Sequence, residues 1–204
     1  MQQLLDRWRR TIGDDADGLG RDLLRRWSEP HREYHTTDHL RAVLDAVDLL
    51  ADHATDPDTV RLAAWFHDAV YNGRPGDDET ASARLAAQAL PATGLDAERV
   101  REVVRLVELT ESHDAEQDDA NGAVLCDADL AVLGGEPEEY AAYAAAIRAE
   151  YSHLRDRDFN RGRAEVLRRL LALDPLYRTP TGRTRWEATA RRNITAELDL
   201  LSVA

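Results

Sequence analysis

Two histidines spaced four residues apart are the first candidates for chemistry. They are His35 and His39, in the stretch YHTTDHL. Side chains at positions i and i+4 of a helix share one face, so the two imidazoles would lie close enough to share a ligand. The spacing alone is weak evidence, because such pairs are frequent by chance. A third histidine, His31, follows Pro30 and is expected to precede the helix, where it would serve structure or face solvent.

The adjacent residues His67 and Asp68, in the stretch WFHDAVY, are a second candidate. They interrupt apolar residues at helical spacing from Leu62 to Val70, so the pattern predicts one continuous helix. Burying an ionised carboxylate costs several kcal/mol unless an opposite charge or hydrogen bonds compensate. A shared cation would satisfy both side chains. The alternative is a His-Asp pair on the solvent face of the helix.

Two further acids, Asp127 and Asp129, interrupt the apolar stretch VLCDADLAVLG. Residues two apart point about 200° away from each other around a helix, so the two carboxylates should not both face one ion. One of them is therefore expected to be a ligand. The other is expected to support the site from behind or to cap a backbone segment.

Together, these three stretches supply two or three imidazoles and two carboxylates. That donor set suits a borderline divalent ion such as Mn, Fe, Co, Ni or Zn better than it suits calcium. The sequence therefore predicts a divalent metal cofactor, with Mg retained as an alternative and the identity of the ion left open.

The elements that must position these side chains are helices. Apolar residues recur at helical spacing through most of the chain, and strand-like alternation is nearly absent. The sequence therefore predicts an all-α fold, a bundle of about nine helices. The expected helices are at about 2–13, 18–28, 37–53, 57–71, 78–90, 96–112, 123–133, 136–154 and 159–173, with a terminal one near 183–201.

Composition limits the class of protein. A chain of 204 residues with 43% hydrophobic residues is long enough for one sizeable core and short for two, so residues 1–204 are expected to form a single domain. The net charge of −13 argues against binding of nucleic-acid polymers or anionic membranes, which clustered positive charge would hold.

Cellular location is predicted from three features. The lone cysteine, Cys126, cannot form an internal disulfide, and the first ten residues, MQQLLDRWRR, carry charges where a signal peptide has an apolar run. No window approaches 18 consecutive apolar residues, the length needed to span a bilayer. The expectation is a cytoplasmic protein that does not enter membranes.

The order and context of the candidate residues resemble the HD-domain superfamily of metal-dependent phosphohydrolases. Its signature is a histidine, then a His-Asp pair, then a distant aspartate, on an all-helical bundle. The matching positions are His39, His67, Asp68 and Asp129. More narrowly, YHTTDHL, WFHDAVY and DADLAVLG are similar to a branch of predicted phosphohydrolases. The motif core covers about residues 29–134, and a C-terminal helical extension covers residues 136–204.

The resemblance implies a role for each residue of the signature. The metal ligands would be His39, His67, Asp68 and Asp129, with Asp68 also catalytic. Asp129 is preferred because relatives place this aspartate in an Ala-Asp-x-Leu context, and Asp127 is held in reserve. YHTTDHL is also similar to a stretch of cyclic-nucleotide phosphodiesterases whose first histidine contacts phosphate and protonates the leaving group. By that likeness, His35 would be the general acid and a substrate contact.

Three further residues have open roles. His113 lies where several HD branches place a histidine for a second metal or for substrate, and the alternative is a loop histidine. Glu79 would be a catalytic base behind the metal or a partner of a helix dipole. Arg32 would be a bidentate clamp on the substrate phosphate or a plain surface arginine.

The function implied is hydrolysis of a phosphoester of a small metabolite or nucleotide by a metal-activated water, at a site with one metal ion. Tyr71 stands where the 5′-nucleotidase branch has a glutamate, so that identity is not supported. The alternatives are an HD-fold iron oxygenase, which needs more histidine ligands, and a non-catalytic nucleotide-sensing module. Homologous bundles often dimerise, so a homodimer is a further expectation, although no residue marks an interface.

Overall fold

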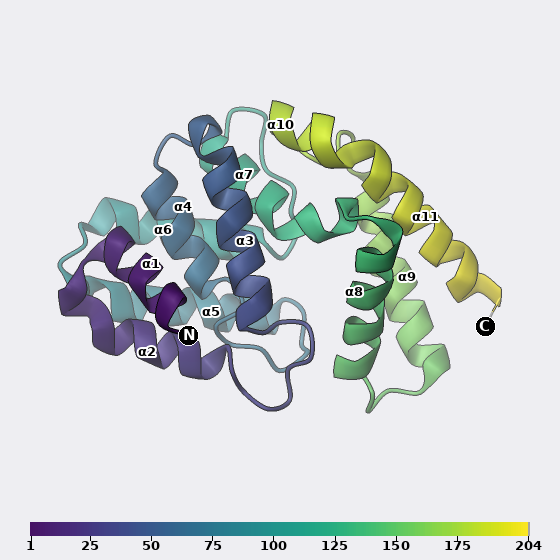
Figure 1. Ribbon diagram of the computed structural model, residues 1–204, viewed down its shortest axis with the longest axis horizontal. Coiled ribbons are helices and arrows are strands. Elements are labelled where there is room, and N and C mark those ends of the chain that lie inside the picture. The colour runs from purple at the N-terminus through teal and green to yellow at the C-terminus, as the bar shows by residue number, and fades with distance from the viewer. Residues whose placement is uncertain (204) are drawn as a thin grey trace.

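The computed structural model describes residues 1–203, and helices are the regular structure of that part of the chain (Figure 1). The predicted all-α bundle is confirmed. The first seven helices are α1 (Gln2–Ile12), α2 (Asp17–Arg26), α3 (Thr37–Leu50), α4 (Pro57–Phe66), α5 (Asp77–Ala89), α6 (Ala97–Leu109) and α7 (Ala120–Asp129). The helical turn η4 (Leu130–Gly134) leads to α8 (Pro137–Glu150), α9 (Asp156–Ala172), the short α10 (Pro180–Gly182), the π turn η5 (Arg183–Glu187) and α11 (Ala188–Val203).

Local capping explains where the helices of the site begin. Thr36 caps α3 by accepting a hydrogen bond from the backbone N–H of Asp38. Asp56 caps α4 in the same way, accepting from the N–H of Thr59, and Pro57 occupies the first helical position. Proline fits there because the first N–H groups of a helix have no partner within it.

Helix α4 ends at Phe66, so the predicted continuation through residue 71 is wrong. The backbone beyond His67 finds partners outside the helix. The Arg32 guanidinium donates to the carbonyls of Asp68 and Ala69, and the hydroxyl of Ser82 bonds both the N–H and the carbonyl of Val70. These bonds replace those that a longer helix would make. Asp68 consequently lies on a loop at the helix end.

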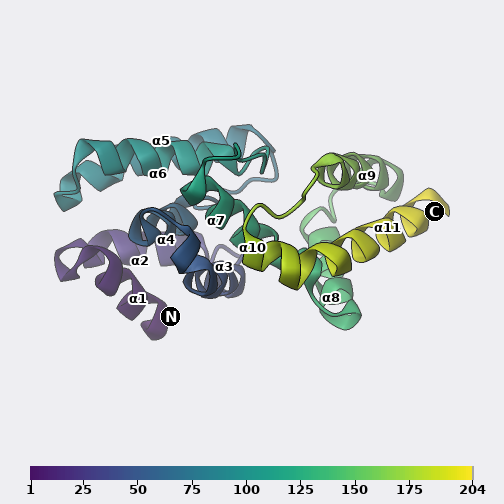
Figure 2. The same cartoon turned by 90° about the horizontal axis from the view of Figure 1, so that it is seen from above.

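The core lies around α3, α4 and α7, which contact one another. Helices α1 and α2 lie on one side of them, and the pair α5 and α6 lies on another, as the view from above shows (Figure 2). Three tryptophans, Trp8, Trp27 and Trp65, are fully buried there. The Trp8 and Trp65 rings meet edge to face with centroids 5.2 Å apart, and the Trp27 indole N–H donates to the Trp65 carbonyl. This packing fixes the ends of α2 and α4 close to the candidate site.

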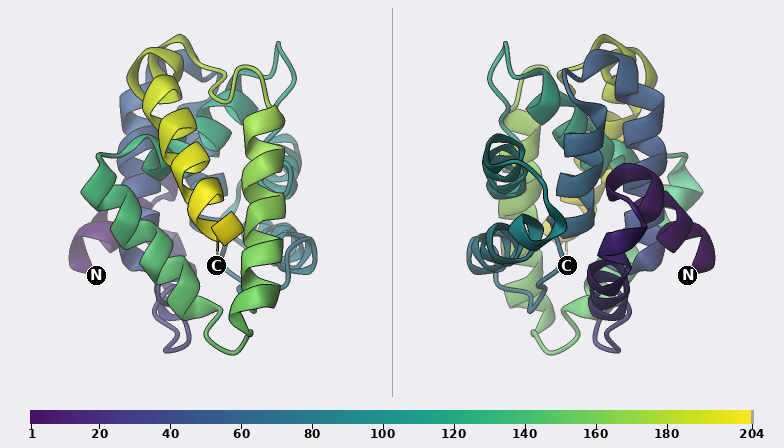
Figure 3. Two further views of the ribbon diagram at one scale, coloured as in Figure 1. Left: turned by 90° about the vertical axis from the view of Figure 1, so that its right-hand side faces the viewer. Right: turned by 90° about the vertical axis from the view of Figure 1, so that its left-hand side faces the viewer.

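Helices α8, α9 and α11 form the other end of the molecule, away from α1 and α2 (Figure 3). Helix α11 packs against α9 and against η4. A buried ion pair strengthens the first contact, since Arg163 of α9 donates to both carboxylate oxygens of Glu197 of α11 at 2.8 and 3.0 Å. Within the described residues, no helix combines the length and apolar character needed to cross a bilayer.

Candidate metal centre and active site

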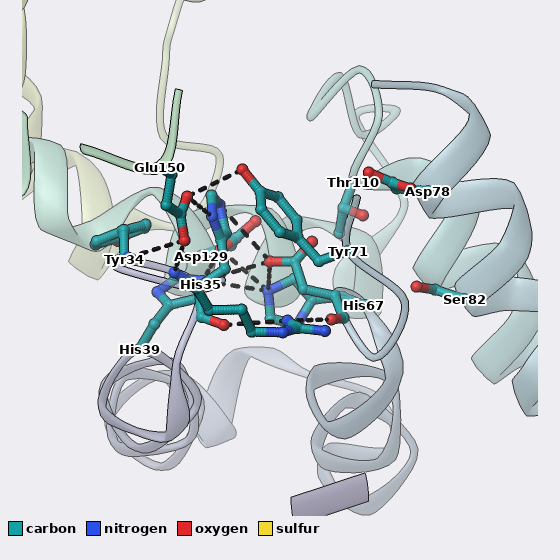
Figure 4. Close-up of polar contacts among 12 residues, drawn as sticks. Tyr34, His35, His39, His67, Tyr71, Asp78, Ser82, Thr110, Asp129 and Glu150 are labelled. Carbon is teal, nitrogen blue, oxygen red and sulfur yellow. Dashed lines mark hydrogen bonds and ion pairs between the residues drawn. The ribbon is translucent and has the colours of Figure 1, made fainter. Parts of the chain in front are cut away.

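Three side chains from three helices meet at one point of the core (Figure 4). His39 is in the first turn of α3, His67 follows the last residue of α4, and Asp129 ends α7. The two Nε2 atoms are 3.3 Å apart. Asp129 Oδ1 lies 3.1 Å from Nε2 of His39 and 3.4 Å from Nε2 of His67. The sequence motifs are thus joined in space, although they are far apart in the chain.

These separations suit a shared metal ion. Ligand nitrogen and oxygen atoms lie about 2.0–2.2 Å from a transition metal, so two ligands at octahedral or tetrahedral angles are about 3.0–3.4 Å apart. The three distances of the cluster, 3.1, 3.3 and 3.4 Å, fall on or close to that range. The group of His39, His67 and Asp129 could therefore hold a metal ion.

Asp68 borders this group and lies close to both of its histidines. Its Oδ2 lies 3.0 Å from Nε2 of His67 and 3.8 Å from Nε2 of His39. Its side chain is 15% exposed, compared with 1% for His67, so Asp68 forms the side of the cluster that faces the cavity. The end of α4 at Phe66 allows this position, because Asp68 is free of helical geometry.

A backbone contact sets the tautomer of His67. Nδ1 of His67 lies 2.8 Å from the carbonyl oxygen of Ala64, which can only accept a hydrogen bond. Nδ1 must therefore carry a proton, and in the neutral imidazole the lone pair is on Nε2, which faces the cluster. Such orientation by a second partner is typical of metal-binding histidines.

The charges of the cluster also favour a cation. Burial lowers the pKa of His39, which keeps that imidazole neutral. Burial also disfavours ionisation of Asp129, but His67 and hydrogen bonds from His113 and His39 outweigh it and hold the pKa of Asp129 well below its usual value. For His67, the carboxylates of Asp68 and Asp129 outweigh burial and raise the pKa well above its usual value. The two ionised carboxylates are thus stabilised by a positive charge between them, which a proton or a metal ion can supply.

His35 stands beside the cluster and is held by Glu150, a residue of α8 that sequence reasoning missed. Nδ1 of His35 lies 2.7 Å from Oε2 of Glu150. The other oxygen, Oε1, accepts backbone N–H bonds from Glu33, Tyr34 and His35 at 2.8–2.9 Å. The Tyr71 hydroxyl also donates to Glu150. One carboxylate at the end of α8 therefore fixes both the loop that carries His35 and its imidazole ring.

The opposite nitrogen of His35 faces the cluster. Nε2 lies 3.9 Å from Oδ2 of Asp68, and the ring stacks on Tyr71 with centroids 4.2 Å apart. Burial disfavours the imidazolium, but the carboxylates of Asp68 and Glu150 outweigh it and raise the pKa of His35. Burial likewise opposes ionisation of Glu150, yet its bonds from His35 lower the pKa of Glu150 to about 2. The arrangement favours a protonated His35 beside an ionised Glu150.

Arg32 does not face the cavity, which corrects its expected role as a phosphate clamp. Its side chain is fully buried. Its five N–H donors all have acceptors: the Glu29 carboxylate, twice, and the carbonyls of His35, Asp68 and Ala69. A guanidinium with no free donor cannot bind a phosphate without breaking these bonds. Arg32 instead joins the His35 loop to the loop after α4.

Replacing Arg32 with methionine is expected to lower the free energy of unfolding by about 2–4 kcal/mol, because three carbonyls lose their donor in a buried position. Urea denaturation measures the change. The matched control is Arg161→Met, at an exposed arginine of α9, which should change stability by less than about 0.5 kcal/mol. An Arg32→Met protein as stable as this control would contradict the structural role.

The remaining candidates, Glu79, His113 and His31, lie at three different places around the cluster. Glu79 accepts a hydrogen bond from the N–H of Gly76 and so caps α5, while it also lines the cavity. His113 lies on the loop after α6, in the left-handed region with φ 55°, and its Nε2 is 2.8 Å from Oδ2 of Asp129, so this loop histidine orients the Asp129 carboxylate. His31 is half exposed and bonds the carbonyl of Tyr71.

Asp127, the reserve ligand, points away from the cluster. It is completely buried and accepts hydrogen bonds from the N–H groups of Arg178 and Thr179 and from the Thr179 hydroxyl, at 2.7–2.8 Å. The two aspartates thus diverge around α7, and the structure places Asp127 as an anchor for the segment that leads into α10.

The chain matches no family model, no curated protein and no solved structure. A function must therefore be inferred from the geometry and chemistry of the site itself. The site itself combines the metal-compatible cluster of His39, His67 and Asp129, the oriented His35 and a cavity that both of them line.

Proposed function

We propose that the protein is a metal-dependent phosphohydrolase acting on a phosphate ester of a small molecule. The observation that carries the proposal is the convergence of two imidazoles and two carboxylates at one end of a cavity of about 530 Å³, with His35 beside them. A volume of this size suits a small-molecule ligand. The likeness of the motifs to the HD-domain superfamily supports the same reading.

In this proposal His39, His67, Asp68 and Asp129 hold a divalent ion. When bound, such an ion lowers the pKa of water toward about 7 and polarises a phosphoryl oxygen. The chain contributes orientation: Ala64 fixes the His67 tautomer, and His113 fixes the Asp129 carboxylate. Ligands held in this way need no rearrangement when the substrate arrives.

His35 supplies the proton for the leaving group. Its Nδ1 is bonded to Glu150, so in the imidazolium the second proton is on Nε2, which faces Asp68 and the cavity. Hydrolysis breaks the bond between phosphorus and the ester oxygen, and that oxygen leaves as an alcohol once it takes the proton. Proton transfer of this kind typically contributes about 10²–10⁴ in rate.

The proposal is tested by elemental analysis of the purified protein followed by assays of phosphate release. We expect about one equivalent of a divalent metal, loss of phosphatase activity on chelation, and recovery on addition of Mn or Co. A His67→Ala variant should lack both metal and activity, whereas His153→Ala, at an exposed histidine, should retain both. A protein that binds metal but releases phosphate from no ester would contradict the proposal.

A further inference from the structure

The cavity extends well beyond the metal-compatible cluster. Its polar end is formed by His35, His39, Asp68 and Asp129, and it continues between the helical bundle and the C-terminal helices α8 and α9. The proposed phosphohydrolase function needs only the polar end. The rest of the cavity is therefore available for the part of the substrate that leaves with the ester oxygen.

Most of the far part of the cavity is lined by the apolar side chains of Leu133, Ile147, Leu154, Phe159, Val166 and Leu170, and the charged residues Asp158, Arg163 and Arg169 of α9 also line it. These residues come from η4, from α8 and α9, and from the loop between the two helices. Val166 and Leu154 are only partly buried, so the wall keeps apolar surface that a ligand could cover. Covering such surface is favourable in proportion to its area.

The charges of the lining argue against a polyphosphate. Acidic residues outnumber arginines in it, and Asp78, Glu79, Glu111 and Asp114 lie on the side near α5 and the end of α6. Of the three arginines, Arg163 is already neutralised by Glu197, and the other two, Arg74 and Arg169, stand against seven acidic residues of the same lining. A di- or triphosphate chain would need additional positive partners. A single phosphoryl group needs only the proposed cation and His35.

The geometry points to a phosphate monoester of an aliphatic alcohol as the substrate class, with the phosphoryl group at the cluster and the alkyl chain along α8 and α9. This inference rests on the proposed function and narrows it. Nucleotides, which carry a polar sugar and polar base edges, fit this wall less well than a chain of methylene groups.

The test is a series of n-alkyl phosphates, from ethyl to decyl, hydrolysed by the metal-loaded full-length protein, with ATP for comparison. The value of kcat/KM should rise about three- to fourfold for each methylene that becomes fully buried. It should exceed the value for ATP at the longer chain lengths. Equal kcat/KM for ethyl and decyl phosphate, or a preference for ATP, would overturn the inference and leave the proposed function standing. Release of phosphate from none of the compounds would overturn the proposed function, and this inference with it.

Variants of the cavity wall test where the alkyl chain of the substrate lies. Val166→Asp places a charge in the wall and should lower the ratio of kcat/KM for decyl over ethyl phosphate by at least about tenfold. The matched control is Leu200→Asp on α11, where the leucine is 73% exposed and outside the cavity lining, and it should keep the ratio. If the aspartate prevents folding, Val166→Thr, which replaces one methyl group with a hydroxyl, should also lower the ratio. A ratio that none of the Val166 variants changes would overturn this placement.

Discussion

Replacing Asp129 with asparagine is expected to abolish binding of the proposed metal ion, whereas the same change at Asp127 is expected to preserve it. Asp129 is the carboxylate that approaches both His39 and His67, and asparagine lacks the negative charge that favours a cation there. Removing a residue that only hydrogen-bonds to a metal ligand typically lowers metal affinity about 10- to 100-fold. Loss of a ligand should cost more, so we expect metal affinity to fall by at least about 10²-fold. Phosphatase activity should fall with the metal content.

The two aspartates make a matched pair, since they lie two residues apart on α7 and differ in what they contact. Asp127→Asn weakens the acceptor of three hydrogen bonds, so it should lower the free energy of unfolding by about 1.5–3 kcal/mol while metal content is kept. Metal content after dialysis, with circular dichroism to check folding, measures both variants. Retention of metal by a folded Asp129→Asn protein would refute the proposed ligand set.

Replacing Glu150 with glutamine is expected to slow the release of alcohols with poor leaving ability while metal content stays the same. The carboxylate accepts a hydrogen bond from the Nδ1–H of His35, and an amide at this position can no longer stabilise the imidazolium charge. The value of kcat for alkyl phosphates should therefore fall by about 10²–10⁴, the range of general acid catalysis. KM should change less, because Glu150 lies behind His35 and is not among the residues that line the cavity.

The leaving group separates this positioning role from a general loss of structure. 4-Nitrophenol leaves without help from an acid, so hydrolysis of 4-nitrophenyl phosphate by the Glu150→Gln variant should fall by less than about tenfold. Glu138→Gln, at an exposed position of the same helix, is the control and should behave as the wild type. An equal loss for alkyl and nitrophenyl esters would show that Glu150 is not needed for proton transfer.

The metal-compatible cluster could be anticipated from the sequence because its signal is local. Each ligand is a polar residue in a short apolar stretch, and such a residue must find a partner when the stretch is buried. The divergence of Asp127 and Asp129 followed from helical geometry alone. The choice between them came from the likeness to a known motif, and in the structure it is Asp129 that meets the histidines.

The roles of Glu150 and Arg32 could not be read from local patterns. Glu150 is separated from His35 by 115 residues, and three of its partners are backbone N–H groups that no spacing reveals. One signal was present: Glu150 continues the face of α8 that carries Tyr143 and Ile147, at positions i+7 and i+3. Arg32 is buried by packing between distant segments, and its sequence context is that of a surface residue.

The end of α4 was misplaced for a related reason. Helical periodicity continues through Val70, so local propensity favours a longer helix. Side chains from elsewhere, Arg32 and Ser82, instead capture the backbone groups after His67. Tertiary contacts thus override a local preference at the position where Asp68 must leave the helix.

Glu150, which orients His35, follows every proposed metal ligand in the sequence. The parts of the site are therefore synthesised in a fixed order. A nascent chain that has emerged through Asp129 contains every proposed ligand, but it lacks the carboxylate that orients the acid. At ordinary elongation rates the intervening stretch adds a delay of about 1–4 s. In the proposed mechanism, the residues that would hold the ion are therefore synthesised before the residue that orients the general acid.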